Sequence, residues 1–289
     1  MIVTGQHRVL VHGITGKQGT FWTEQMQAYG TRIVGGVHPT KAGTEHCGVP
    51  VFASAEQAAA ELDGGVDVSV LFVPPAGARA AIDDAVAAGT EMVVVLTEFI
   101  PVHDTMAAVA NATEAGCVLM GPNTAGVVTP GEAFVGFMPA FDDRIFNPGR
   151  VGVLSRSGSL GTLACVELTR AGLGQSAFLG IGGDPVSGTS TADAFATLDA
   201  DPKTDAIVVI GEIGGRKEED AAEVIAASSK PVASFIAGAT SPPGKRMGHA
   251  GAIVEGSTGT HTSKRRALED AGAIVVDVPW ELPAALGLG

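Results

Sequence analysis

The side chain best suited to covalent chemistry is His249, in the segment GKRMGHAGAI at residues 244–253. Small residues surround it, and Lys245 and Arg246 come shortly before it. A lone loop histidine usually has no chemical role. Small neighbours, however, leave room for a large anion, and an imidazole can carry a phosphoryl group when one ring nitrogen is free and an acceptor holds the other.

Glu212 is the carboxylate that can hold the second ring nitrogen. It ends a strongly apolar run, where an unpaired carboxylate would be costly. Ser157, Gly158 and Ser159 follow another apolar run and open a helix, whose N-terminal N–H groups and dipole favour phosphoryl oxygens. An ordinary helix cap is the alternative, but it explains one serine better than three successive small positions.

A second anion site is predicted by GITGKQG at residues 13–19, which contains Thr15, Gly16, Lys17 and Gln18. Glycines between a strand and a helix let backbone amides approach a pyrophosphate. The spacing departs from G-x-G-x-x-G, so a purely structural turn is the alternative.

Lys41 stands near the end of the second expected strand, where a NAD-binding domain places an acid. A lysine there favours a ligand with an extra phosphate, such as NADP or coenzyme A (CoA). Pro74 and the segment Leu96, Thr97 and Glu98 lie at two further strand ends, where ligands bind in parallel sheets. Glu98 is either a hydrogen-bond acceptor for such a ligand or a solvated loop acid.

Alternating short apolar runs and helical stretches must position these residues. In the first half we expect strands at 7–13, 32–37, 66–74, 91–98 and 117–123. The last of these strands ends at Asn123. The helices between them are expected at 20–30, 54–64, 77–89 and 104–116. In the second half, strands are expected at 151–158, 175–183, 205–215, 231–238 and 273–278. The helices there are expected at 160–172, 191–201, 218–229 and 263–272.

This rhythm predicts an α/β protein with two doubly wound parallel sheets, the second of them flavodoxin-like. We expect one domain at 1–123 and another at 151–289. Residues 124–150 have no helical period and are predicted to form a packed crossover, because their phenylalanines need burial.

Composition limits the class of protein. The formal charge of −13 argues against a nucleic-acid partner. Three widely spaced cysteines indicate neither disulfides nor a thiolate metal site, and no metal site is expected. The N-terminus lacks the features of a signal peptide, and no apolar run approaches the ~18 residues needed to span a bilayer. We expect a soluble cytoplasmic protein without membrane contact.

Several blocks together resemble one known family. GITGKQGTF, GPNTAGVVTPGE, SRSGSLG, GIGGDP, IVVIGEIGG and GKRMGHAGAI have the order and spacing seen in the alpha subunit of succinyl-CoA synthetase, over nearly the whole chain. The resemblance implies a Rossmann-like CoA-binding domain before a flavodoxin-like ligase domain. It also implies a separate ATP-grasp beta subunit that binds the Mg-nucleotide, in a heterodimer or heterotetramer.

The resemblance also implies roles for residues. His249 matches the histidine that is transiently phosphorylated, Glu212 the glutamate that orients it, and Ser157 opens the helix that steadies the phosphoryl group. The matching CoA-binding positions, with Pro74 and Asn123 added as neighbouring strand ends, are Thr15, Gly16, Lys17, Gln18, Lys41, Leu96, Thr97 and Glu98. The implied reaction converts a carboxylate, CoA and a nucleoside triphosphate reversibly into acyl-CoA, nucleoside diphosphate and phosphate, through phosphohistidine and an acyl phosphate.

The chain departs from the family on the acid side. After SRSG the succinate enzymes usually continue T-L-T-Y-E, whose tyrosine helps to form the carboxylate site, but here Thr162 replaces it. Trp22 stands where a histidine is common, and Phe99 where the family has glycine. We therefore expect ligase chemistry on a shifted acid, such as malate, an itaconate-like acid or a sulfonated acid.

Two other classes stay open. An NADP-linked oxidoreductase is compatible with Lys41, although the second half does not resemble a hydride-transfer domain. A non-catalytic CoA-binding homologue is disfavoured because it would have no reason to keep both Glu212 and His249.

Overall fold

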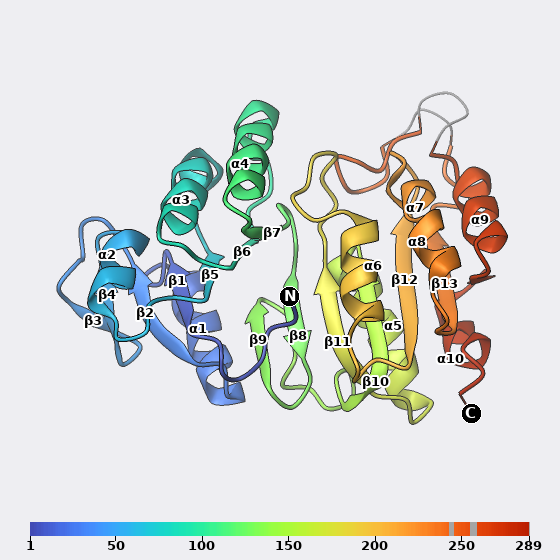
Figure 1. The fold of residues 1–289 in the computed structure, drawn as a ribbon, viewed down its shortest axis with the longest axis horizontal. Helices are drawn as coiled ribbons and strands as arrows, with labels where there is room; N and C mark the ends of the chain where they lie inside the picture. Colours follow the sequence, from blue (N-terminus) through green and yellow to red (C-terminus); the bar gives the residue numbers. More distant parts are fainter. Residues whose placement is uncertain (243–245, 255–258, 289) are drawn as a thin grey trace. The chain divides into compact units, whose positions relative to one another are not determined.

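The computed structural model describes residues 1–242, 246–254 and 259–288, and the chain forms two compact units (Figure 1). The first consists of Val3–Phe141 with Met1 and Val186–Gly188. The second consists of Asp142–Pro185 and Thr189–Gly289 with Ile2. In the described part of the chain, no helix is both long and apolar enough to cross a membrane.

The first unit is built on a mostly parallel sheet in the strand order β3-β4-β2-β1-β5-β6-β7. Its strands are β1 (Val9–His12), β2 (Ile33–Val37), β3 (Glu45–His46), β4 (Val49–Phe52), β5 (Val68–Leu71), β6 (Met92–Val95) and β7 (Val118–Met120). Its helices are α1 (Lys17–Tyr29), α2 (Ala55–Glu61), α3 (Pro75–Ala87) and α4 (Val102–Glu114). Only the short β3 pairs antiparallel in this sheet, and the other six strands follow the Rossmann order 3-2-1-4-5-6. The predicted Rossmann-like fold is confirmed.

Val, Leu and Met make up most of β1, β5 and β6. Every residue of β1, β5 and β6 is buried, as expected where helices cover both faces of a parallel sheet. At the end of β1 the chain turns sharply: a Cβ on Gly19 would lie 2.2 Å from the carbonyl oxygen of Gly13. The glycines therefore bring the start of α1 directly against the turn, which is what an anion loop requires.

Residues 124–150 contain a β-hairpin. The sequence did not predict it, because no periodic pattern was found in this segment. Strands β8 (Gly126–Thr129) and β9 (Ala133–Gly136) pair antiparallel. The N–H of Glu132 donates to the carbonyl of Thr129 (3.0 Å), with Pro130 and Gly131 at the turn and Gly131 at φ 80°. This is the chemistry of a type II turn, so Pro-Gly between two four-residue apolar runs was the missed signal. Phe134 is buried, but Phe137 and Phe141 are exposed, against the expectation that these aromatics are covered.

The second unit holds five parallel strands in the order β14-β13-β12-β10-β11. They are β10 (Pro148–Ser155), β11 (Gln175–Gly180), β12 (Ala206–Glu212), β13 (Val232–Ala237) and β14 (Ile274–Val276). The helices are α5 (Gly158–Arg170), α6 (Thr191–Asp199), α7 (Lys217–Asp220), α8 (Ala222–Ala227), α9 (His261–Asp270) and α10 (Leu282–Ala285), with a 3-10 turn η1 (Pro279–Glu281). Counted along the chain, the order is 2-1-3-4-5, so the predicted flavodoxin-like sheet is confirmed.

The strand order brings two predicted site segments together. β10 pairs with β12 in parallel, so Ser155 at the end of β10 lies beside Ile210 near the end of β12. Between these strands the order reverses, and such a switch point is where ligands bind in open α/β sheets. The segment that begins at Arg156 and the carboxylate of Glu212 are therefore delivered to the same sheet edge.

Candidate functional site

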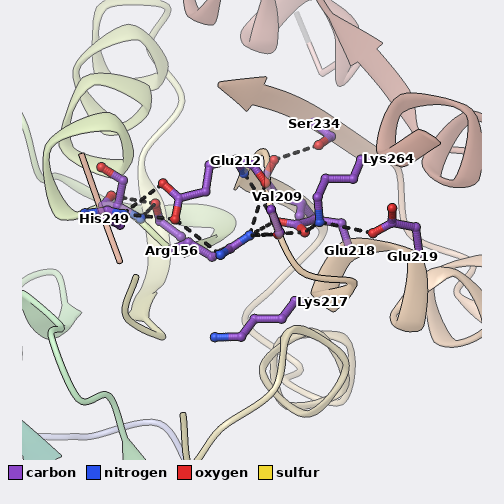
Figure 2. Close-up of polar contacts among 12 residues, drawn as sticks. Arg156, Val209, Glu212, Lys217, Glu218, Glu219, Ser234, His249 and Lys264 are labelled. Carbon is purple, nitrogen blue, oxygen red and sulfur yellow. Dashed lines mark hydrogen bonds and ion pairs between the residues drawn. The ribbon is translucent and has the colours of Figure 1, made fainter. Parts of the chain in front are cut away.

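His249 and Glu212 are in direct contact (Figure 2). His249 Nδ1 lies 2.9 Å and 2.8 Å from the two carboxylate oxygens of Glu212. Glu212 is the last residue of β12 and its side chain is only 7% exposed, whereas the His249 ring is 27% exposed. A carboxylate at Nδ1 favours the tautomer with the proton on that atom, so the lone pair of Nε2 is the nucleophile that the ring can offer.

The contact raises the pKa of His249 above its ordinary value. The hydrogen bond to Glu212 is the main cause, burial works against it, and the charge of Glu212 adds to the rise. The charged ring is thus stabilised in the resting site, and the neutral, nucleophilic ring becomes dominant only as the pH rises through that pKa.

Arg156 contacts Glu212 and so helps to hold the pair of Glu212 and His249. Its Nη2 lies 3.3 Å from Oε1 of Glu212, and its Nη1 donates to the backbone carbonyls of Glu212 and Gly214, each at 3.1 Å. The guanidinium is 2% exposed. A buried carboxylate needs such a partner, and Arg156 supplies it to Glu212 next to the imidazole.

A second layer of buried charge holds Arg156. Its Nη1 donates to Oε1 of Glu218 (3.2 Å), and Glu218 also pairs with Lys264, which in turn contacts Glu219 (3.0 Å). Glu218 and Lys264 are fully buried. Burial alone would raise the pKa of Glu218, but Arg156 and Lys264 outweigh it and hold that pKa below its usual value. Figure 2 shows the resulting row of alternating charges from His249 to Glu219.

Gly183 makes room for the imidazole. A Cβ at this position would lie 2.3 Å from Cγ and Nδ1 of His249, closer than any real contact. On the loop that carries His249, the N–H of Gly251 donates to the carbonyl of Gly183 (3.2 Å). Of the two cations expected before the histidine, Arg246 is exposed and Lys245 lies outside the described residues.

The predicted helix start is present next to Arg156. Ser157 is the N-cap of α5, and its Oγ accepts from the N–H of Leu160 (3.4 Å) and lies 3.3 Å from Oγ of Ser159. Ser157 is buried, Gly158 half-buried and Ser159 exposed. The cap thus explains Ser157, and the rest of the first turn keeps its positive dipole end. Thr162 donates its hydroxyl to the carbonyl of Gly158 (2.8 Å), so it is held against its own helix.

Four predicted coenzyme residues of the first unit line one cavity of about 670 Å³: Thr15, Gly16, Lys41 and Pro74. Four others line a second cavity of about 600 Å³: Gln18, Leu96, Thr97 and Glu98. Phe72 and Val73 line both, so the two hollows adjoin. Lys17 and Asn123 are in neither lining, although the N–H of Asn123 donates to the carbonyl of Thr97 (3.0 Å).

The first cavity also contains a residue that we did not single out, His12. It is buried at the end of β1, and its Nε2 has no hydrogen-bond partner among the described residues. Burial lowers the pKa of His12 to about 4, against the opposing charge of Asp84, so the ring is neutral at pH 7. A polar residue inside an apolar strand was the available signal.

Arg156, Gly183, Glu218 and Lys264 were likewise missed as site residues. Their importance depends on which strands and helices become neighbours. Only the sheet order and the packing of α7 and α9 reveal that.

Two family models match the chain. One, described as CoA binding domain, covers residues 4–99, and the other, described as CoA-ligase, covers residues 154–274. The chain is 52% identical over 285 residues to the succinate–CoA ligase [ADP-forming] subunit alpha of Methanothermobacter thermautotrophicus, covering 97% of this chain and 95% of that protein. It is 42% identical over 281 residues to the ADP-forming sulfoacetate-CoA ligase subunit SauD of Bilophila wadsworthia, covering 96% and 95%.

The fold is also found in a solved structure. ATP citrate lyase from Methanothrix soehngenii superposes with a TM-score of 0.89 at 22% identity, over 99% of this chain and 50% of that chain. At this identity the likeness concerns the fold alone.

Proposed function

The chain belongs to the family of alpha subunits of ADP-forming succinate–CoA ligases, which are acid–thiol ligases, and from that premise we propose that His249 is its phosphoryl carrier. The single observation that carries the proposal is the contact of His249 Nδ1 with both oxygens of Glu212. It orients the ring, fixes the tautomer and leaves Nε2 to attack phosphorus.

The proposed reaction has three balanced steps. Nε2 of His249 attacks the terminal phosphorus of a nucleoside triphosphate, and the diphosphate leaves. A carboxylate oxygen of the acid then attacks the phosphohistidine, which gives an acyl phosphate and returns the ring. Finally, the thiol of CoA loses its proton and its sulfur attacks the acyl carbon, so that acyl-CoA forms and inorganic phosphate leaves.

The residues behind His249 would serve the first two steps. Glu212 stabilises the positive charge that develops on the ring as the new bond to Nε2 forms, and Arg156 holds Glu212 in place. The start of α5, which follows Arg156 directly, offers N–H groups and the positive dipole end to phosphoryl oxygens.

CoA would bind to the first unit. The glycine turn at Thr15 and Gly16 suits the pyrophosphate, and Lys41 on the rim of the same cavity suits the 3′-phosphate. Neutral His12 inside this cavity adds a polar surface for the nucleotide end. Isothermal titration distinguishes this from the oxidoreductase alternative, because CoA should bind and NADP should not.

The triphosphate and its Mg²⁺ would be supplied by a separate ATP-grasp beta subunit, in a heterodimer or heterotetramer. The name "subunit alpha" of the relatives supports this partner. The three cysteines are free thiols, which fits a reducing cytoplasm as the proposed compartment.

The acid is proposed to differ from succinate. Thr162 stands where the family's tyrosine contacts the carboxylate, and its hydroxyl is directed to Gly158. A relative that is named for sulfoacetate supports a shift toward another acid. The test is acyl-CoA formation by the chain co-expressed with its partner, with succinate, malate, itaconate and sulfoacetate in parallel. Succinate as clearly the best substrate would contradict this part of the proposal.

A further inference from the structure

Phe99 combines two unfavourable features. Its backbone lies in the left-handed region at φ 62°, and its side chain is 75% exposed. A bulky residue is rarely found in that region, and an exposed ring gains nothing from burial. Outliers of this kind cluster at ligand sites, where a ligand compensates for the cost.

Phe99 lines the cavity of about 600 Å³ in the first unit, together with two other aromatic residues, Trp22 of α1 and Phe137 beyond β9. Trp22 is fixed: its ring centroid lies 6.3 Å from that of Phe137, and its indole N–H donates to Oε1 of Gln18 (3.2 Å). In the part of the chain that the structure describes, no such ring contact is found for Phe99. Trp22 and Phe137 therefore contact each other in one wall of the cavity, whereas Phe99 is uncovered.

The cavity continues from the proposed nucleotide site, because Phe72 and Val73 line both hollows. CoA is long and has two chemically different ends. Its nucleotide end carries phosphates, which suit Lys41 and the glycine turn. Its arm carries methyl groups, methylenes, two amides and the thiol, which suit apolar walls with a few polar groups. Gln18, Thr97 and Glu98 supply those polar groups around the aromatic cavity.

We propose that Trp22, Phe99 and Phe137 form an aromatic clamp on the thiol-bearing arm of CoA, with Phe99 as the residue that the arm covers. The clamp positions the arm, and with it the thiol, while the phosphates are held in the adjoining cavity. This inference rests on the proposed function, because it takes CoA as the occupant.

The test compares two ligands on the full-length chain by isothermal titration: CoA, and adenosine 3′,5′-bisphosphate, which keeps the phosphate-bearing nucleotide end but lacks the arm. Phe99→Ala should lower the affinity for CoA about 3- to 10-fold, the range expected for one aromatic contact. It should leave the bisphosphate unchanged, and Phe99→Tyr should restore CoA affinity.

Two further variants separate the ring from the backbone. Phe99→Gly should weaken CoA binding as much as Phe99→Ala does. The Phe99→Gly protein should, however, have a higher melting temperature than the Phe99→Ala protein, because glycine accepts φ 62° without strain. Phe141→Ala removes another exposed phenylalanine that is not in the lining of either cavity, and should leave both ligands unaffected.

Two results would overturn the clamp: unchanged CoA affinity in Phe99→Ala, or equal weakening of CoA binding and bisphosphate binding. If CoA affinity is unchanged and the beta subunit binds more weakly, Phe99 is assigned to a subunit contact. A wild-type chain that binds no CoA would instead refute the proposed function itself.

Discussion

The imidazole of His249 is tied to a buried carboxylate, and this fixes how its reactivity depends on pH. The hydrogen bond to Glu212 raises the pKa of His249, so the neutral ring appears only as the pH rises through that elevated value. Glu212→Gln should shift the midpoint of the pH–phosphorylation profile to lower pH and lower the plateau by at least about tenfold, because the amide no longer enforces the tautomer. An unshifted profile would mean that Glu212 does not set this pKa.

The same contact contributes to stability in a defined pH window. Because the folded-state pKa is raised, the stabilisation is complete below the unfolded value of about 6.5 and is lost as the pH rises through the folded value. The difference in urea midpoint between the wild type and Glu212→Gln should therefore be larger at pH 5.5 than at pH 9. A difference that grows with pH would contradict the assigned direction.

Gly183 tests the clearance around the ring. Gly183→Ala would place a methyl group 2.3 Å from Cγ and Nδ1 of His249, so the ring must leave its position beside Glu212. We expect phosphorylation to be lost while the circular dichroism spectrum is retained. A fully phosphorylated Gly183→Ala protein would show that the ring does not react from this position.

The sequence predicted the pair of Glu212 and His249 but not the residues that hold this pair in place. Glu212 was a carboxylate in an apolar run and His249 an imidazole among small residues, and each needed a partner. Arg156 and Gly183 carry no such signal alone, because their roles arise only when β10, β11 and β12 become neighbours.

Among the elements, α7 and α9 are joined to the site by buried charge. Glu218 of α7 accepts from Arg156 and pairs with Lys264 of α9. Glu218→Gln would leave two buried cations without this carboxylate, which should lower the free energy of unfolding by about 3–5 kcal/mol.

Asp277→Asn is the matched control, because it breaks the pair with Arg265 at a site where the Asp277 side chain is 76% exposed. Such surface pairs contribute at most about 1 kcal/mol. Denaturant titration compares the two variants, and equal losses would argue against a structural role of the buried network.

The loop after β2 carries the predicted phosphate contact. If Lys41 binds the 3′-phosphate, Lys41→Ala should lower the affinity for CoA about tenfold, the loss typical of one charge-assisted contact. The affinity for dephospho-CoA, which lacks this phosphate, should hardly change. Titration calorimetry with the two ligands measures this. Equal weakening of both would place Lys41 elsewhere along the coenzyme.

The regular elements were largely predictable because parallel strands buried on both faces appear as uninterrupted Val, Ile and Leu runs. The expected strand at 205–215 is β12 (Ala206–Glu212), and the expected strand at 231–238 is β13 (Val232–Ala237). The β8–β9 hairpin was missed, because four-residue strands around Pro130–Gly131 lack the length that a periodic pattern needs.

For the whole molecule, each of the two sheets carries a candidate site at its switch point, and both candidate sites were expected from glycine-rich strand ends. The strand orders 3-2-1-4-5-6 and 2-1-3-4-5 could be inferred as fold types from the alternation of strands and helices. The side-chain networks at the edge of a sheet could not be inferred from the sequence, because residues far apart in the sequence meet there.

Labelling shows whether His249 carries a phosphoryl group. The chain, co-expressed with its beta subunit, is incubated with ATP labelled in the terminal phosphoryl group, and the label is followed in acid and in base. We expect a base-stable, acid-labile phosphate on the chain that is absent in His249→Asn. An unlabelled wild-type chain, or a label that persists in His249→Asn, would contradict it.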